Sequence, residues 1–164
     1  MSDGRQSTSD ESQKERIDRE LIELLNELRV AIPGIQILFA FLLTVPFAFG
    51  FGEITTFQRD VYFVALLSSA LASALLIAPS AQHRILFRQQ DKAQLLKRAN
   101  VLAIAGLVFL AFAITAVILL ITDILFSTAA VIVVSAVVAA VFTSLWFAHP
   151  VLRRRAKHES DASS

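Results

Sequence analysis

The sequence predicts an all-α, polytopic membrane protein in which an amphipathic cytoplasmic helix precedes four transmembrane helices arranged as two hairpins. Hydrophobic residues make up 55% of the 164 residues, whereas soluble domains contain about 45–50% apolar residues. Four stretches of at least 23 residues carry no charged side chain, and roughly 20 apolar residues are enough to cross a membrane as a helix. Lysine and arginine gather at the two ends and in one central loop.

The segment before the first apolar stretch is polar and divides into two parts. Residues 1–10 are rich in serine and aspartate, which predicts a disordered N-terminal tail. Residues 11–29 carry apolar side chains at helical spacing, which predicts an amphipathic cytoplasmic helix. These apolar side chains are Ile17, Leu21, Leu24, Leu25 and Leu28. We expect no cleaved secretory signal, because no short apolar core is followed by a cleavage site.

Residues 30–149 form the predicted transmembrane domain, with spans at about 30–50, 61–78, 100–121 and 129–148. A helix satisfies its own backbone hydrogen bonds in lipid, so each span is expected to be helical. Pro33 and Gly34 are expected to bend or break the chain before the first span, and Pro79 and Ser80 to close the second. Residues 150–164 are expected to be a basic and then disordered cytoplasmic tail.

The basic residues predict which side of the membrane each end occupies. With the N-terminus inside, all but one of the 15 lysines and arginines lie on the cytoplasmic side, the exception being Arg59. Membrane proteins carry an excess of these residues in their cytoplasmic loops. We therefore expect both termini in the cytoplasm, with short outer connections at about 50–60 and 122–128.

Small residues four positions apart predict where the helices pack, because lipid gives helices no hydrophobic reason to associate and close backbone approach is needed. The second span has Ser69 with Ser73, Ala70 with Ala74, and Ala74 with Ala78; the fourth has Ser135 with Ala139, and Ala136 with Ala140 and Ser144. These faces are expected to contact other helices, within one chain or between chains.

The predicted spans carry no ionisable side chain near their centres. Such groups are costly in a membrane and functional where they occur, so their absence argues against ion or proton transport. Thr44 and Thr115 are expected to bond back to carbonyls of their own helices. Gln36 is expected to pack or to form an interhelical hydrogen bond. Asp123 is expected to act in a turn rather than in contact with a cation.

Two histidines lie beside prolines and ahead of arginines, His83 in APSAQHRILFR and His149 in WFAHPVLRRR. Because histidine titrates near neutral pH, both are candidates for a pH-sensitive interface. Anchoring at the membrane surface is the simpler account, since no carboxylate partner stands near them in sequence.

The central loop contains a basic ridge, in which Arg84, Arg88 and Lys92 recur every four residues and Lys97 and Arg98 follow. Anionic lipid headgroups are one partner for such a ridge, at about 1 kcal/mol for each basic residue near the surface. The acidic face of the N-terminal helix, Glu20, Glu23 and Glu27, is an internal partner. Docking of that helix on the loop is therefore one hypothesis, and a solvated charged face is the other.

No motif predicts catalysis, a cofactor or a metal site. The chain lacks cysteine, which excludes disulfides, thiolate metal sites and a cysteine nucleophile, and its five glycines form no phosphate-binding loop.

We expect a non-enzymatic membrane scaffold or accessory protein that acts through its cytoplasmic helix and basic loop; the alternative is a small oligomeric cation or proton transporter. The expected partners are the lipid bilayer with its anionic headgroups, and further copies of the chain or another membrane protein, but not nucleic acid.

Several segments together resemble an uncharacterised family of small four-helix membrane proteins from actinobacteria. They are RIDRELIELLNELRVAIPGIQILFAFLLTVPF, LLIAPSAQHRILFR, the DK and KRAN that follow, and ITD at the end of the third span. The resemblance implies a protein of the bacterial inner (plasma) membrane with both termini cytoplasmic, and it brings no known activity or catalytic residue. Some similar sequences carry a sodium:proton antiporter label, against which the missing mid-membrane carboxylate speaks.

Overall fold

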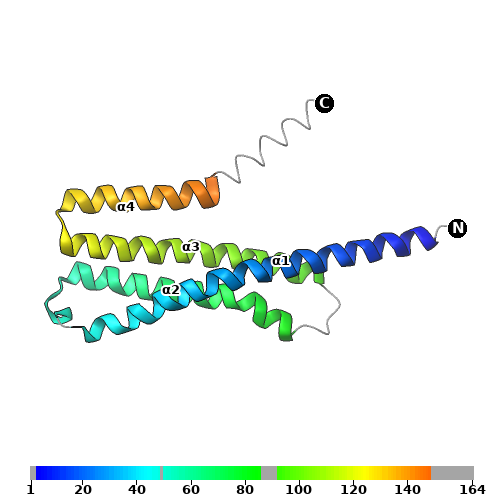
Figure 1. Ribbon diagram of the computed structural model, residues 1–164, viewed down its shortest axis with the longest axis horizontal. Coiled ribbons are helices and arrows are strands. Elements are labelled where there is room, and N and C mark those ends of the chain that lie inside the picture. The colour runs from blue at the N-terminus through cyan, green and yellow to red at the C-terminus, as the bar shows by residue number, and fades with distance from the viewer. Residues whose placement is uncertain (1–2, 49, 86–91, 149–164) are drawn as a thin grey trace, which may run out of the picture. The chain divides into compact units, whose positions relative to one another are not determined.

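The computed structural model describes residues 3–48, 50–85 and 92–148, with side chains for residues 15–48, 50–82, 84 and 94–145. Four long helices make up this part of the chain (Figure 1). They are α1 (Asp3–Thr44), α2 (Thr56–Ile85), α3 (Lys92–Leu125) and α4 (Thr128–Phe142). Two 3-10 turns, Val45–Phe47 and Phe51–Glu53, lie between α1 and α2, and a π-helical turn at Thr143–Ala148 extends α4. The predicted all-α class is confirmed.

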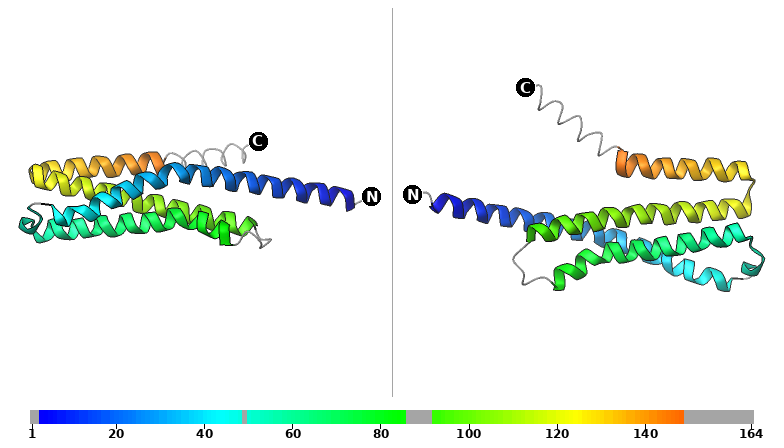
Figure 2. Two further views of the ribbon diagram at one scale, coloured as in Figure 1. Left: turned by 60° about the horizontal axis from the view of Figure 1, so that its bottom comes forward. Right: turned by 180° about the vertical axis from the view of Figure 1, so that it is seen from behind.

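The chain divides into two compact units, Met1–Phe51 with Leu66–Leu110 and Gly52–Ala65 with Ala111–Ser164. In the first unit, α1 packs against the second part of α2 and the first part of α3 (Figure 2). The core of this unit joins Leu28 and Ile35 of α1 with Ala72 and Leu76 of α2 and Ala103 of α3. The first unit is therefore a three-helix assembly with a shared apolar core.

Helix α1 is continuous over 42 residues, where we expected a disordered tail, a separate helix and a break. It includes residues 3–10 and passes through Pro33 and Gly34. Extending an existing helix adds one hydrogen bond per residue without a new nucleation cost, which accounts for the polar N-terminal turns. Pro33 removes one backbone donor, but Leu28 before it and Ile35 after it are both buried in the core. Packing on both sides of the proline holds α1 in one piece.

Helix α2 is longer than predicted at both ends. It continues through Pro79 and Ser80 to Ile85 instead of ending there, and the Pro79 side chain is fully buried. At the start of α2, the N–H of Thr55 donates to Oε1 of Gln58 (3.0 Å), and the N–H of Gln58 donates to Oγ1 of Thr55 (3.2 Å). This reciprocal capping box satisfies two free donors and sets where the helix begins.

The face that α2 buries in the first unit passes through Ser69, Ala72, Leu76 and Pro79. Alternating spacings of three and four residues are what packing between nearly parallel helices produces. Of the small residues predicted to make contacts on α2, Ser69 lies on this face, whereas Ala74 is exposed. The prediction assumed contacts at every fourth residue, and it therefore identified only some of the residues on the contact face.

Gly106 of α3 brings α3 close to α2. A Cβ atom at this position would lie 2.7 Å from both Cγ and Cδ2 of Leu76, and 3.3 Å from the backbone nitrogen of Leu76. Leu76 is fully buried and has little room to withdraw. A side chain at position 106 is therefore excluded by the present packing, and the sequence analysis did not identify this contact.

In the second unit, α4 follows α3 after only Phe126 and Ser127, so the connection is shorter than the predicted one at 122–128. Val131 is the buried residue of α4. The predicted small-residue faces of α4 divide: Ser135 and Ala139 are half-buried, whereas Ala136, Ala140 and Ser144 are exposed. Most of the α4 surface is thus left uncovered by the rest of the second unit.

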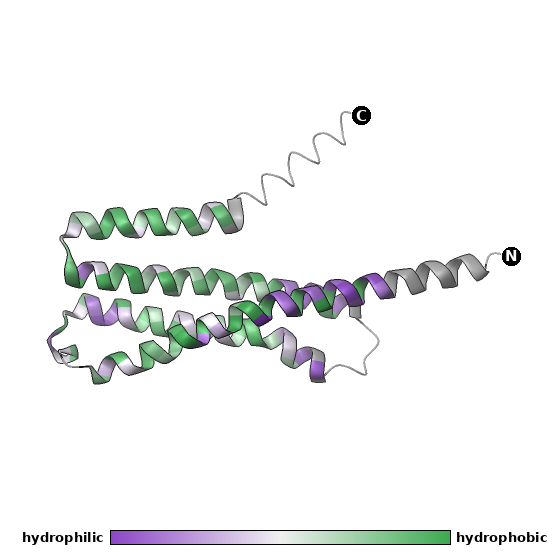
Figure 3. Cartoon of the chain, viewed as in Figure 1, coloured by the Kyte–Doolittle hydropathy of each residue, from purple (hydrophilic) through white to green (hydrophobic). Residues whose placement is uncertain are grey.

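Four helices are long and apolar enough to cross a membrane. The stretches concerned are Glu15–Phe47, Thr56–Gln82, Gln94–Leu125 and Thr128–Leu145. Hydrophilic residues gather in the coloured turns of α1 that follow its grey N-terminal end, at both ends of α2 and at the start of α3 (Figure 3). Large apolar side chains, including Phe41, Phe63, Phe112 and Ile132, are exposed. Exposed apolar surface, where it is contiguous, marks contact with a membrane or with another protein.

Candidate functional site

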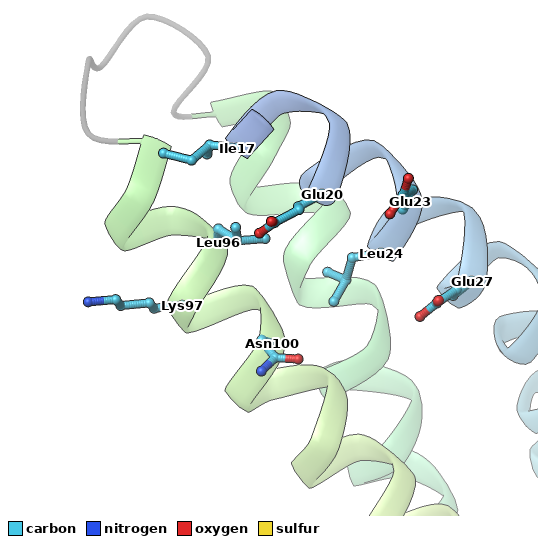
Figure 4. Close-up of a pocket in the computed structure, with 8 residues that line it drawn as sticks. All are labelled: Ile17, Glu20, Glu23, Leu24, Glu27, Leu96, Lys97 and Asn100. Carbon is cyan, nitrogen blue, oxygen red and sulfur yellow. The ribbon is translucent and has the colours of Figure 1, made fainter. Parts of the chain in front are cut away.

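A groove of about 530 Å³ lies between α1 and α3 in the first unit. Its lining consists of Ile17, Glu20, Glu23, Leu24 and Glu27 from α1, and Leu96, Lys97 and Asn100 from α3 (Figure 4). The α1 residues share one side of the helix because they are three or four positions apart. We call this surface the acidic groove, since it combines apolar side chains with three carboxylates.

The carboxylates of the acidic groove are exposed and poorly neutralised. Arg16 Nε donates to Glu20 Oε1 at 3.0 Å, and the two side chains are 72% and 44% exposed. An ion pair this exposed contributes less than about 1 kcal/mol. Within the described part of the chain, Glu23 and Glu27 form no ion pair. Lys97 lines the groove, but its ammonium points away from the three glutamates (Figure 4).

Docking of the acidic face on the basic ridge stays a prediction. Arg84 is exposed near the end of α2, Arg88 lies outside the described residues, and Lys92 begins α3 with its side chain outside the described part. The pH-sensitive interface also stays a prediction, because the His83 side chain and all of His149 fall outside the described residues.

The segment that the structure places beside the acidic face is the start of α3, although it does not neutralise the three glutamates. Lys97 and Asn100 line the same groove as the three glutamates. Lys97 belongs to the basic cluster recognised in the sequence, whereas Asn100 was missed. A single asparagine next to an apolar stretch does not by itself indicate a binding site. Asn100 lines the groove only because α1 packs against α3.

A second polar contact lies in the second unit, at the end of α3. Asp123 Oδ2 accepts a hydrogen bond of 2.9 Å from Gln58 Nε2, and Asp123 belongs to the last turns of α3 rather than to a turn between helices. The expected turn role of Asp123 is therefore wrong. Gln58 uses both ends of its amide, because its Oε1 accepts from the Thr55 N–H. The pattern TTFQ signals the cap, but nothing local points to Asp123.

The remaining polar residues of the helices behave largely as expected. Thr44 Oγ1 donates to the Phe41 carbonyl at 2.7 Å, and Thr115 Oγ1 donates to the Ala111 carbonyl at 2.8 Å, which confirms the expected back-bonding. Gln36 is exposed instead of packed against another helix. Among the residues that the structure describes, no three His, Asp or Glu side chains are placed together to hold a metal ion.

Comparison with known proteins identifies the family and no function. The family model described as "Family of unknown function (DUF6328)" matches residues 10–150, which include α2, α3, α4 and most of α1. No curated protein and no solved structure matches the chain. Because the matched residues make up most of the sequence, this chain belongs to the family of unknown function DUF6328.

Proposed function

We propose that this chain is a multi-pass protein of the bacterial plasma membrane that acts as a non-enzymatic, self-associating scaffold, with both termini in the cytoplasm. The observation that carries the proposal is the acidic groove, a surface of three exposed glutamates and apolar side chains on α1 and α3. The occupant that we propose is the basic C-terminal segment of a second copy of the chain.

The lengths of the helices support a groove outside the bilayer. At about 1.5 Å per residue, the 42 residues of α1 and the 34 residues of α3 measure about 63 and 51 Å. The hydrocarbon core of a bilayer is only about 30 Å thick. Both helices therefore extend beyond it, and their polar ends are the N-terminal part of α1 and the start of α3, where the groove lies (Figure 3).

The charge distribution supports the orientation. All but one of the 15 lysines and arginines fall on the side of the N-terminus when four spans are counted, which is the cytoplasmic side by the positive-inside rule. An even number of spans returns the C-terminus to the same side. The groove and the C-terminal segment then share the cytoplasm, which docking between copies requires.

The C-terminal segment has the chemistry that the groove lacks. Val151 and Leu152 precede three consecutive arginines, Arg153–Arg155, and a lysine, Lys157. Its apolar pair matches the apolar lining of the groove, and its cations match the unpaired glutamates, Glu23 and Glu27. Helix α4, which precedes this segment, leaves most of its apolar surface uncovered. In a membrane, such a surface is available for packing against a helix of another copy.

Crosslinking between copies tests the proposal, because the chain contains no cysteine. Two differently tagged versions, Leu24→Cys and Leu152→Cys, are expressed together in bacterial membranes and oxidised. We expect a disulfide-linked dimer that carries both tags; since each copy has one cysteine, this bond joins two copies. Ile22→Cys is the matched control, because Ile22 lies on α1 with 58% of its surface exposed but does not line the groove.

Replacing the glutamates of the groove by neutral glutamines tests whether the crosslink depends on their charge or arises from random collision of the copies. The combined Glu20→Gln, Glu23→Gln and Glu27→Gln replacement should reduce the mixed-tag dimer to the level of the Ile22→Cys control. An equal yield from Leu24→Cys and Ile22→Cys contradicts docking in the groove. Cation-dependent proton flux across liposomes that contain the purified chain would instead favour the transporter, the alternative function.

A further inference from the structure

A second pocket, which shares only Lys97 with the acidic groove, lies between the end of α2 and the start of α3 in the first unit. Its volume is about 370 Å³, and its lining consists of Gln82 from α2 and Lys97, Arg98, Val101 and Leu102 from α3. All five residues belong to the first unit. We call it the basic pocket, since it holds two cations and no acid.

The basic pocket changes from charged to apolar along α3. Lys97 and Arg98 are exposed, and the next turn presents Val101, which is 65% exposed, and Leu102. The uncharged stretch of α3 begins directly after Arg98. This arrangement is complementary to a phospholipid. The two cations can bind its anionic phosphate, and the apolar side chains of the next turn can contact its acyl chains. Basic pockets between helices on the cytoplasmic side are a known way of binding anionic headgroups.

Gln82 favours a ligand of the basic pocket that can donate a hydrogen bond. Its Oε1 is buried and has no hydrogen-bond partner among the described residues. Leaving such an acceptor unpaired costs about 1–3 kcal/mol in a folded protein. The Gln82 side chain is only half-buried as a whole, so a ligand gains affinity if this side chain turns its Oε1 into the pocket and accepts an O–H there. Lys97 is free to serve the pocket, because its ammonium points away from the glutamates of the acidic groove (Figure 4).

We propose that the basic pocket binds a phospholipid with an anionic phosphate and a glycerol headgroup, of the phosphatidylglycerol type. Lys97 and Arg98 bind the phosphate, Gln82 Oε1 accepts a hydrogen bond from a headgroup hydroxyl, and Val101 and Leu102 contact the first part of an acyl chain. The inference rests on the proposed membrane insertion, but not on self-association. The sequence already pointed to Lys97 and Arg98 as part of a basic cluster that could meet anionic headgroups; the pocket adds Gln82, Val101 and Leu102 and with them a specific lipid.

Native mass spectrometry of the full chain from mixed micelles measures this binding as the ratio of retained phosphatidylglycerol to retained phosphatidylcholine. In the double variant Lys97→Gln/Arg98→Gln this ratio should fall roughly thirtyfold, which corresponds to about 1 kcal/mol for each basic residue near an anionic surface. Arg84→Gln is the matched control, because Arg84 is an exposed cation on α2 that does not line the pocket. Because the control removes one charge instead of two, a fall of about fivefold in Arg84→Gln would mean that net charge, and not the pocket, selects the lipid.

The hydroxyl requirement is tested with phosphatidylmethanol, an anionic lipid that lacks a headgroup hydroxyl. The unmodified chain should retain phosphatidylglycerol several-fold better than phosphatidylmethanol, and Gln82→Leu should abolish that preference. No preference in the unmodified chain overturns the role of Gln82. Displacement of the lipid by excess inorganic phosphate would overturn the assignment to a lipid.

Membrane insertion itself is measured separately, by flotation of the chain with phosphatidylcholine vesicles after alkaline extraction. A chain that floats but shows no lipid preference refutes this inference and leaves the proposed function in place. A chain that does not float refutes the proposed membrane protein itself.

Discussion

Replacing Gly106 by alanine should destabilise the first unit, because the new methyl group meets the side chain of Leu76. The added Cβ would lie 2.7 Å from Cγ and Cδ2 of Leu76, well inside van der Waals contact. Leu76 cannot move aside easily, since it is fully buried and its backbone nitrogen lies 3.3 Å from the same Cβ. Inserting a methyl group into a closely packed core costs about 1–3 kcal/mol.

A second glycine in a helix isolates this steric cost. Gly34 lies inside α1, and a Cβ atom there would have no neighbour within 4 Å. Gly34→Ala and Gly106→Ala both gain about 1 kcal/mol of helix propensity, so the difference between them reports the contact with Leu76. At about 2–4 °C per kcal/mol for a chain of this size, Gly106→Ala should melt about 2–12 °C below Gly34→Ala.

Thermal unfolding in detergent measures the difference, as the fraction of each variant that remains monodisperse in size-exclusion chromatography after heating at one fixed rate. Leu76→Ala provides an internal check, because its cost should be smaller in the Gly106→Ala background, where the new methyl group fills part of the cavity. Equal melting temperatures for Gly106→Ala and Gly34→Ala would refute the close approach of α3 to α2.

Two further predictions use the same measurement. Gln58→Leu should lower the melting temperature by several degrees, because the Thr55 N–H would lose its capping acceptor and the Asp123 carboxylate would lose its donor. Adding Asp123→Leu should recover only the part that is due to the Asp123 contact, and a purely additive decrease would contradict the pairing. Ser69→Ala should change stability by less than about 1 kcal/mol, because Ser69 Oγ bonds the Leu66 carbonyl of its own helix, whereas Ser69→Leu should cost about 1–3 kcal/mol at this fully buried position. Similar melting temperatures for the two Ser69 variants would show that the face is not packed.

The candidate site could be predicted from the sequence on one side only. Glu20, Glu23 and Glu27 share a helix face by their spacing, and α1 does present them to one groove. The other side of the groove, with Lys97 and Asn100, comes from a helix about 70 residues further along the chain and depends on how α1 packs. For the same reason Gln82 was missed, since the role that we propose for it depends on its position beside α3.

The sequence by itself determined that the chain has four long apolar helices, because the length of an uncharged stretch is a local property and a helix satisfies its backbone locally. It also determined the back-bonding of Thr44 and Thr115, which needs only the helix that carries them. Only the tertiary structure decided that α1 and α2 continue through Pro33 and Pro79, and that Asp123 pairs with Gln58. Those outcomes depend on contacts between distant segments, where packing outweighs the local cost of a proline and supplies a partner that no local pattern reveals.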